Sequence, residues 1–241
     1  MSGTEAPPRA RVGVGVAAGV WFGALLLSVV VFQVVVAATG YSGEQLDLLP
    51  FWLFPTVSML ALWIPTLVLL WVVSRRRMTG SFVKDFTLRF RWIDLVGVPV
   101  GVLSQLAVLQ VVYWPFAHWF PETFSREDVE RAARDLTERA SGSWRIVLVV
   151  AVVVCAPLVE ELLYRGLILG SLSGSLARPV AVVVSALWFA ASHLQPVQFI
   201  GLFVFGVVLG ACRAGTRRLG MGVLAHAAFN ATSVVILWPR K

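Results

Sequence analysis

Charged side chains are scarce in this chain. Only 14% of its 241 residues are Asp, Glu, Lys or Arg, whereas 58% are hydrophobic and the mean hydropathy is +0.82. Soluble globular domains carry about 25% charged and about 45–50% apolar residues. The composition therefore excludes an ordinary soluble domain and predicts an all-α, polytopic transmembrane helical bundle.

Cysteine is also rare, and the common hydrolase motifs are missing. Cys155 and Cys212 lie in apolar runs without metal-site spacing, so we interpret them as small hydrophobic residues. The chain has no Gly-x-Ser-x-Gly and no His-Glu-x-x-His sequence, which excludes the hydrolases that these motifs mark. Its first apolar run, about 12–39, is longer than the roughly 7–15 residues of a cleavable signal, so we expect a span there.

Long apolar runs make up most of the sequence. A helix needs about 20 apolar residues to cross a bilayer core. The runs predict about seven spans, over about 12–39, 50–73, 94–114, 144–170, 179–194, 198–212 and 219–237. We therefore divide the chain into a polar tail (1–11), N-terminal transmembrane helices (12–114), an extracytoplasmic loop (115–143) and a second transmembrane region (144–241).

The net charge of +7 comes from arginines in the short loops. Arg9 and Arg11 precede the first span and 75–77 follow the second, so the positive-inside rule predicts a cytoplasmic N-terminus in the cell membrane. Residues 80–93 alternate aromatic and basic side chains, as in a nucleic-acid patch or an interfacial segment. Their place between two spans favours the interface, so we expect the lipid bilayer as a partner and no nucleic acid.

The loop 115–143 predicts one short amphipathic helix. Ser125 and Asp128 have the spacing of a helix cap, and apolar residues then recur at helical spacing from Val129 to Ala140. The helix has two interpretations, a lid over a functional site and a connector on the outer face. His118, near the start of the loop, is expected to be an interfacial residue and not a ligand.

A pair of carboxylates interrupts the fourth apolar run. Charged groups at membrane depth cost roughly 2.5–3.5 kcal/mol each, which marks Glu160, Glu161 and Arg165 as a functional-site hypothesis. Glu161 and Arg165 are four residues apart on a helix and can pair. Glu160 points about 100° away and is the carboxylate left free to act.

Three more polar side chains occur at similar depth in later spans. His193 lies in the fifth predicted span, and His226 and Asn230 share one face of the seventh. With a carboxylate, two imidazoles and an amide, a pocket can activate water and stabilise an oxyanion. Glu160, His193 and His226 could equally hold a divalent metal, with zinc the expected ion. Polar packing between helices and a transporter's proton relay are the other interpretations.

The polar residues form three linked motifs. In chain order they are Glu160-Glu161-x-x-x-Arg165, Phe189-x-x-x-His193 and His226-x-x-x-Asn230. The pattern resembles the signature of the CAAX prenyl protease and bacteriocin-processing (CPBP, or Abi) family, which includes the Ras-converting enzyme. The resemblance covers about residues 144–234, so 144–241 is the expected catalytic, CPBP-like core.

The resemblance implies an intramembrane metalloendopeptidase that cleaves a membrane-anchored peptide or protein. It implies that Glu160 and His193 activate water and that His226 and Asn230 hold the oxyanion. Glu161, Arg165 and Phe189 are implied as supporting residues. The alternative is a non-proteolytic membrane protein of the same fold, either a bacteriocin self-immunity factor or a transporter-like protein.

Overall fold

The computed structural model describes residues 12–40, 53–140 and 142–238, and every regular element in these ranges is a helix. The predicted polar tail 1–11 lies outside the described residues. In chain order the elements are α1 (Val14–Ala38), α2 (Leu53–Arg77), α3 (Phe82–Asp85), η2 (Trp92–Val96), α4 (Gly97–Leu103), η3 (Ser104–Val108), α5 (Leu109–Trp119), α6 (Arg126–Arg139), α7 (Trp144–Val150), η4 (Ala151–Cys155), α8 (Ala156–Glu160), η5 (Glu161–Ile168), α9 (Leu169–Leu172), α10 (Arg178–Ser192), α11 (Phe199–Thr216) and α12 (Gly220–Leu237).

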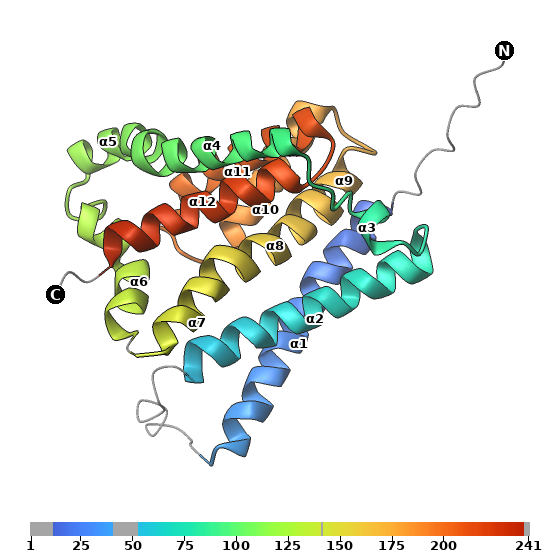
Figure 1. Ribbon diagram of the computed structural model, residues 1–241, viewed down its shortest axis with the longest axis horizontal. Helices are drawn as coiled ribbons and strands as arrows, with labels where there is room; N and C mark the ends of the chain where they lie inside the picture. Colours follow the sequence, from blue (N-terminus) through green and yellow to red (C-terminus); the bar gives the residue numbers. More distant parts are fainter. Residues whose placement is uncertain (1–11, 41–52, 141, 239–241) are drawn as a thin grey trace.

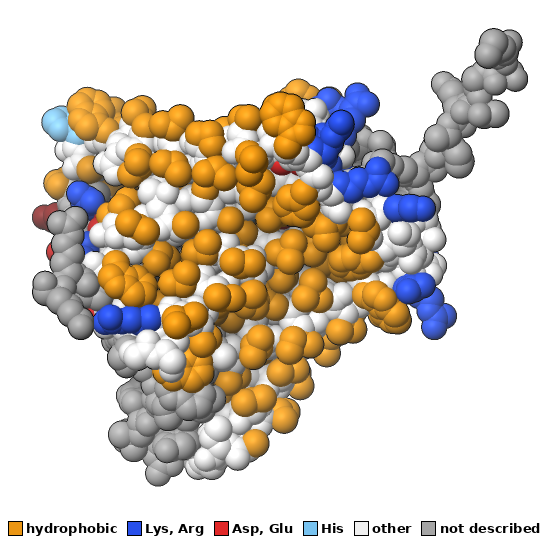
Figure 2. Space-filling view, in the orientation of Figure 1, with side chains coloured by type: hydrophobic (Ala, Val, Ile, Leu, Met, Phe, Trp, Pro, Cys, Tyr) orange, Lys and Arg blue, Asp and Glu red, His pale blue; other side chains and the backbone are white. Residues whose placement is uncertain are grey.

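Within the described ranges, six helical stretches are long and apolar enough to cross a membrane. They are Val14–Ala38, Pro55–Arg77, Trp92–Trp119, Trp144–Leu172, Phe199–Thr216 and Gly220–Leu237. The expected helical bundle is therefore confirmed, and the chain is a multi-pass membrane protein. Figure 2 shows one face of it, on which apolar side chains cover the middle while Lys and Arg lie toward the two ends.

The fifth predicted span differs from the other six. It corresponds to α10, which has 15 residues, fewer than the spanning helices. At 1.5 Å per residue such a helix covers about 22 Å, less than a hydrocarbon core of about 30 Å. The helix ends at Ser192, so His193 lies at its C-terminal end, at the start of a turn, and not inside a span.

The helices form two flanks around a central group. α1 packs against α2 on one side of the molecule, and α4 packs against α12 on the other (Figure 1). Between them lie the continuous stretch α7–α9 and the packed pair α10 and α11. The main apolar core lies where this stretch meets α1, α2 and α10, and it includes Leu70, Phe86, Leu162, Leu167, Ile168 and Phe189.

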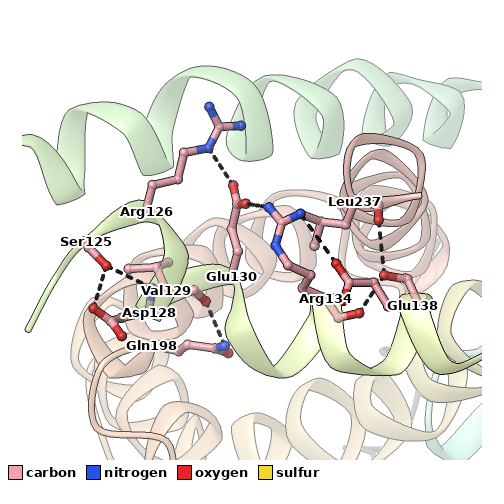
Figure 3. Close-up of polar contacts among 10 residues, drawn as sticks. Ser125, Arg126, Asp128, Val129, Glu130, Arg134, Glu138, Gln198 and Leu237 are labelled. Atoms are coloured by element: carbon pink, nitrogen blue, oxygen red, sulfur yellow. Dashed lines mark hydrogen bonds and ion pairs between the residues drawn. The ribbon is translucent and has the colours of Figure 1, made fainter. Parts of the chain in front are cut away.

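The predicted amphipathic helix is α6. The Ser125 hydroxyl caps it by accepting from the backbone N–H of Asp128 at 3.1 Å, as the sequence indicates. Two long-range hydrogen bonds fix its position. Gln198 Nε2, at the start of α11, donates to the Val129 carbonyl at 2.9 Å, and Thr137 Oγ1 donates to the Leu237 carbonyl at 3.1 Å (Figure 3). α6 therefore connects the start of α11 to the end of α12.

Candidate active site

The helix that carries both glutamates contains two π-helical segments, η4 and η5. In η4 the Ala156 N–H donates to the Ala151 carbonyl five residues earlier. The next residue, Pro157, has no N–H. The Val152 carbonyl therefore has no backbone donor in its own helix, because the Ala156 N–H bonds to Ala151 and Pro157 has no N–H. Asn230 Nδ2 on α12 donates to this carbonyl instead, at 2.8 Å. π-Bulges often occur at functional sites, and this one fixes Asn230 against the glutamate helix.

Glu161 and Arg165 form the predicted pair in η5. Arg165 Nη1 lies 3.0 Å from Glu161 Oε1, and both side chains are almost fully buried. Arg165 Nη2 donates to the Gly206 carbonyl on α11 at 3.1 Å, and its Cζ lies 4.4 Å from the centre of the Phe189 ring. The guanidinium thus contacts a carboxylate, a carbonyl and an aromatic face, which together compensate for burying its charge.

Gly222 on α12 makes room for the other oxygen of Glu161. A Cβ at position 222 would lie 2.7 Å from Glu161 Oε2. This oxygen is buried and has no hydrogen-bond partner among the described residues. A close approach of α12 to the glutamate helix therefore depends on glycine at this position.

His226 lies between the two glutamates. Its Nδ1 is 3.4 Å from Glu161 Oε1, and its Nε2 is 3.7 Å from Glu160 Oε2. Phe189 and Phe205 meet the imidazole edge to face, with ring centres 5.9 and 5.4 Å away. The aromatic contacts hold the plane of the ring, so that one imidazole connects the buried carboxylate to the more accessible one.

Glu160 is the accessible carboxylate of the cluster. Its side chain is 25% exposed, against 0% for Glu161 and 5% for His226. Together with His193 it lines a cavity of about 730 Å³. His193 Nδ1 lies 2.7 Å from the Phe189 carbonyl. Because a carbonyl only accepts, Nδ1 carries the proton of the neutral ring and Nε2 remains as its acceptor.

The cavity is mainly apolar, and residues far apart in the chain line it. Trp21, Trp63, Leu187 and Trp188 contribute much of the wall. The polar part includes the Tyr164 hydroxyl, which lies 2.6 Å from Ser192 Oγ and accepts from Trp21 Nε1 at 3.3 Å. The sequence did not predict Trp21 and Ser192 as cavity residues. Nothing in the sequence around Trp21 indicates that it contacts Tyr164, 143 residues later in the chain.

The structure thus assembles most of the predicted polar residues, but not all in one cavity. Glu160, Glu161, Arg165 and His226 form one contiguous cluster. His193 shares the apolar cavity with Glu160, whereas Asn230 contacts the backbone of η4.

The predicted metal ligands do not form a metal-binding set in this arrangement. Over the described ranges, no three His, Cys, Asp or Glu side chains are gathered as ligands of one ion. Of the expected set, Glu160 and His226 face each other at 3.7 Å, and His193 directs Nδ1 to a carbonyl. We therefore derive no chemical step through a metal, and the metal stays a prediction.

Comparison with known protein families identifies the same region. Residues 142–232 match the family described as type II CAAX prenyl endopeptidase Rce1-like. The match contains all three polar motifs, and α1 to α6 precede it. No curated protein and no solved structure gives a significant match. The match confirms the resemblance expected from the motifs and supports a protease, and residues 142–232 of the chain are similar to the Rce1-like CAAX prenyl endopeptidases.

Proposed function

We propose that this protein is an intramembrane endopeptidase that hydrolyses a peptide bond of a membrane-anchored peptide or protein. The observation that carries the proposal is the shared cavity of Glu160 and His193, with an apolar wall and a carboxylate accessible from it. An apolar cavity of this size accommodates a short stretch of a membrane-anchored chain and places its backbone near the carboxylate. We place the protein in the cell membrane with a cytoplasmic N-terminus, as the arginine distribution favours.

In the proposed reaction Glu160 and His193 activate a water molecule. Glu160 takes a proton from the water while His193 Nε2 accepts the second hydrogen bond and orients it. The water oxygen bonds to the scissile carbonyl carbon, and the carbonyl electron pair moves onto its oxygen. The C–N bond then breaks as the oxyanion collapses, and Glu160 returns its proton to the leaving amine.

The oxyanion is assigned to donors on α12. His226 Nε2 faces Glu160, and Asn230 Nδ2 has a second hydrogen besides the one given to Val152. Losing one oxyanion donor typically lowers a rate by about 10²–10³. Glu161 and Arg165 act as positioning residues, because Glu161 contacts His226, Arg165 contacts Glu161, and neither lines the cavity that Glu160 and His193 share.

Substrate trapping tests the proposal without a known substrate. Membranes that contain the Glu160→Gln variant should retain a membrane-anchored protein that the parent releases as cleaved product. Reconstituted parent protein should then cleave that protein, whereas Glu160→Ala and His193→Ala should be inactive. His118→Ala is the matched control, because His118 stacks on Trp114 away from the cavity and should keep parental activity.

Two results separate the alternatives. A Glu160→Ala enzyme that still cleaves would end the hydrolase assignment to this site. A chain that binds a peptide and never cleaves it in any membrane would favour the self-immunity or transporter-like alternative. The same assay with a chelator tests the zinc ion that the sequence predicts. Full activity in chelator would overturn the prediction of a metal and would leave the reaction by Glu160 and His193 unaffected.

A further inference from the structure

A second cavity, of about 540 Å³, lies at the arginine-rich end of the bundle. The end of α9, the start of α10 and the end of α11 meet there (Figure 1). Its polar lining includes Asp85, Thr87, Arg165, Ser171, Ser173, Arg178, Arg213 and Arg217. Of these residues, Arg165 also belongs to the candidate active site, where it pairs with Glu161.

The cavity has an excess of positive charge. Arg178, Arg213 and Arg217 line it in addition to Arg165, which is paired with Glu161. In the part of the chain that the structure describes, neither Arg178 nor Arg217 forms an ion pair with a carboxylate. Asp85 is the one acidic residue among the described residues of the lining, and it already accepts from Ser74 Oγ at 2.6 Å and from the Thr79 N–H at 3.2 Å.

A further feature indicates a ligand. Ser171 lines the cavity with 4% of its surface exposed, and its buried hydroxyl has no hydrogen-bond partner in the described ranges. A buried polar group without a partner is rare in folded proteins and calls for a water, an ion or a ligand.

We propose that this cavity binds a phosphate group. Guanidinium groups bind phosphate through paired, charge-assisted hydrogen bonds, and a serine hydroxyl donates to the same oxygens. The cavity lies where α9 and α11 end and α10 begins, beside the loops that connect the transmembrane region. Phosphates of lipid headgroups lie at this depth, and phosphate esters in solution also reach it, so both are sources of the same chemistry.

The test measures binding to the purified full-length protein in detergent. The melting temperature is followed with phosphatidylglycerol, with diacylglycerol, which lacks a phosphate, and with glycerol phosphate, at constant ionic strength. Phosphatidylglycerol, glycerol phosphate or both should raise the Tm of the parent above its value with diacylglycerol. The variant Arg178→Gln/Arg217→Gln should bind the active anion at least about tenfold more weakly than the parent does. Each of the two substitutions removes a charge-assisted hydrogen bond.

A matched control separates the cavity from the charged surface. Arg76→Gln/Arg77→Gln removes the same charge from exposed residues of α2 that do not line the cavity, and it should respond like the parent. A response to the lipid alone identifies a headgroup, and a response to glycerol phosphate as well identifies the phosphate itself as sufficient. If neither anion raises the Tm of the parent, or if both double variants lose the response equally, the proposal is wrong.

Loss of folding in the cavity variant would not hide the result. The single variant Ser171→Ala changes one hydroxyl and keeps every arginine. It should melt like the parent with diacylglycerol and should show a smaller shift with the active anion. An unchanged shift in Ser171→Ala, together with an unfolded Arg178→Gln/Arg217→Gln variant, would also count against the site.

Discussion

His226 Nδ1 lies 3.4 Å from Oε1 of Glu161, a carboxylate without exposed surface. The same oxygen lies 3.0 Å from Arg165 Nη1. The other ring nitrogen of His226, Nε2, lies near Glu160, the carboxylate that reaches the apolar cavity. The buried pair therefore sets the position of His226, and His226 in turn links the pair to Glu160.

Arg165→Ala should destabilise the folded protein as well as reduce cleavage. The substitution leaves Glu161 buried without its cation, and breaking a buried pair in this way costs about 3–5 kcal/mol. The measurement is the yield and the Tm of the purified variant in detergent. Arg76→Ala is the control, because it removes an exposed arginine and should change stability by less than about 0.5 kcal/mol. An Arg165→Ala protein that accumulates and melts like the parent would contradict the structural role.

Gly101→Ala should separate α4 from α12. A Cβ at Gly101 would overlap backbone atoms of Ala225 and Phe229, which cannot yield as a flexible side chain would. Overpacking costs about 1–3 kcal/mol, and here it would also move the helix that carries His226. The Tm and the cleavage rate should therefore fall together. In Gly19→Ala, a Cβ at Gly19 meets nothing within 4 Å, so this control should keep the parental Tm.

The sequence predicts the parts of this fold that depend on local properties. Apolar runs gave the six spanning stretches, because length and hydropathy are properties of a single segment. The Glu161–Arg165 pair followed from its spacing of four residues, which holds on any helix. Arg165 keeps this contact although η5 is π-helical.

What the sequence does not give is the packing between segments. The position of His226 between two carboxylates depends on how α12 approaches the glutamate helix, with Gly222 in contact. The bond of Asn230 to Val152 depends on the π-helical segment before Pro157, which hydropathy does not reveal. The predicted fifth span, 179–194, is already short at 16 residues, and α10 ends two residues before its end, at Ser192, which places His193 in the following turn.

Arg218→Ala should loosen the connection between η2 and the loop before α12. Arg218 donates to both carboxylate oxygens of the buried Asp94, at 2.7–3.0 Å. The hydrogen bond to Asp94 raises the pKa of the Arg218 guanidinium above its ordinary value. A raised pKa stabilises the fold below the ordinary pKa of arginine, and this stabilisation is lost only in more alkaline solution. The Tm difference between parent and Arg218→Ala should therefore stay constant between about pH 6 and 9.

A double-mutant cycle checks that the effect belongs to this pair. Asp94→Asn and Arg218→Ala should each lower the Tm, and the double variant should lose less than the sum of the two. Additive losses would show that Asp94 and Arg218 act independently, and a Tm difference that varies across the pH range would show that another titrating group contributes to the effect.

Asn230 has one structural and one proposed chemical role, and the two can be separated. Asn230→Ala leaves the Val152 carbonyl without its donor, at a cost of about 1–3 kcal/mol, and also removes a proposed oxyanion donor. The variant should melt below the parent and retain weak activity, lowered by about 10²–10³. Neither loss alone tells which role matters for cleavage.

Combining Asn230→Ala with Pro157→Ala separates the structural role of Asn230 from its proposed chemical role. The Pro157→Ala substitution restores an N–H five residues after Val152, which can donate to that carbonyl in a π-helical turn. In Asn230→Ala/Pro157→Ala the Tm should therefore recover toward that of Pro157→Ala alone, because Val152 again has a donor. Activity should stay low, because no backbone N–H can take the place of Asn230 at the oxyanion. Recovery of cleavage together with the Tm would show that Asn230 acts only by holding α12 against the glutamate helix.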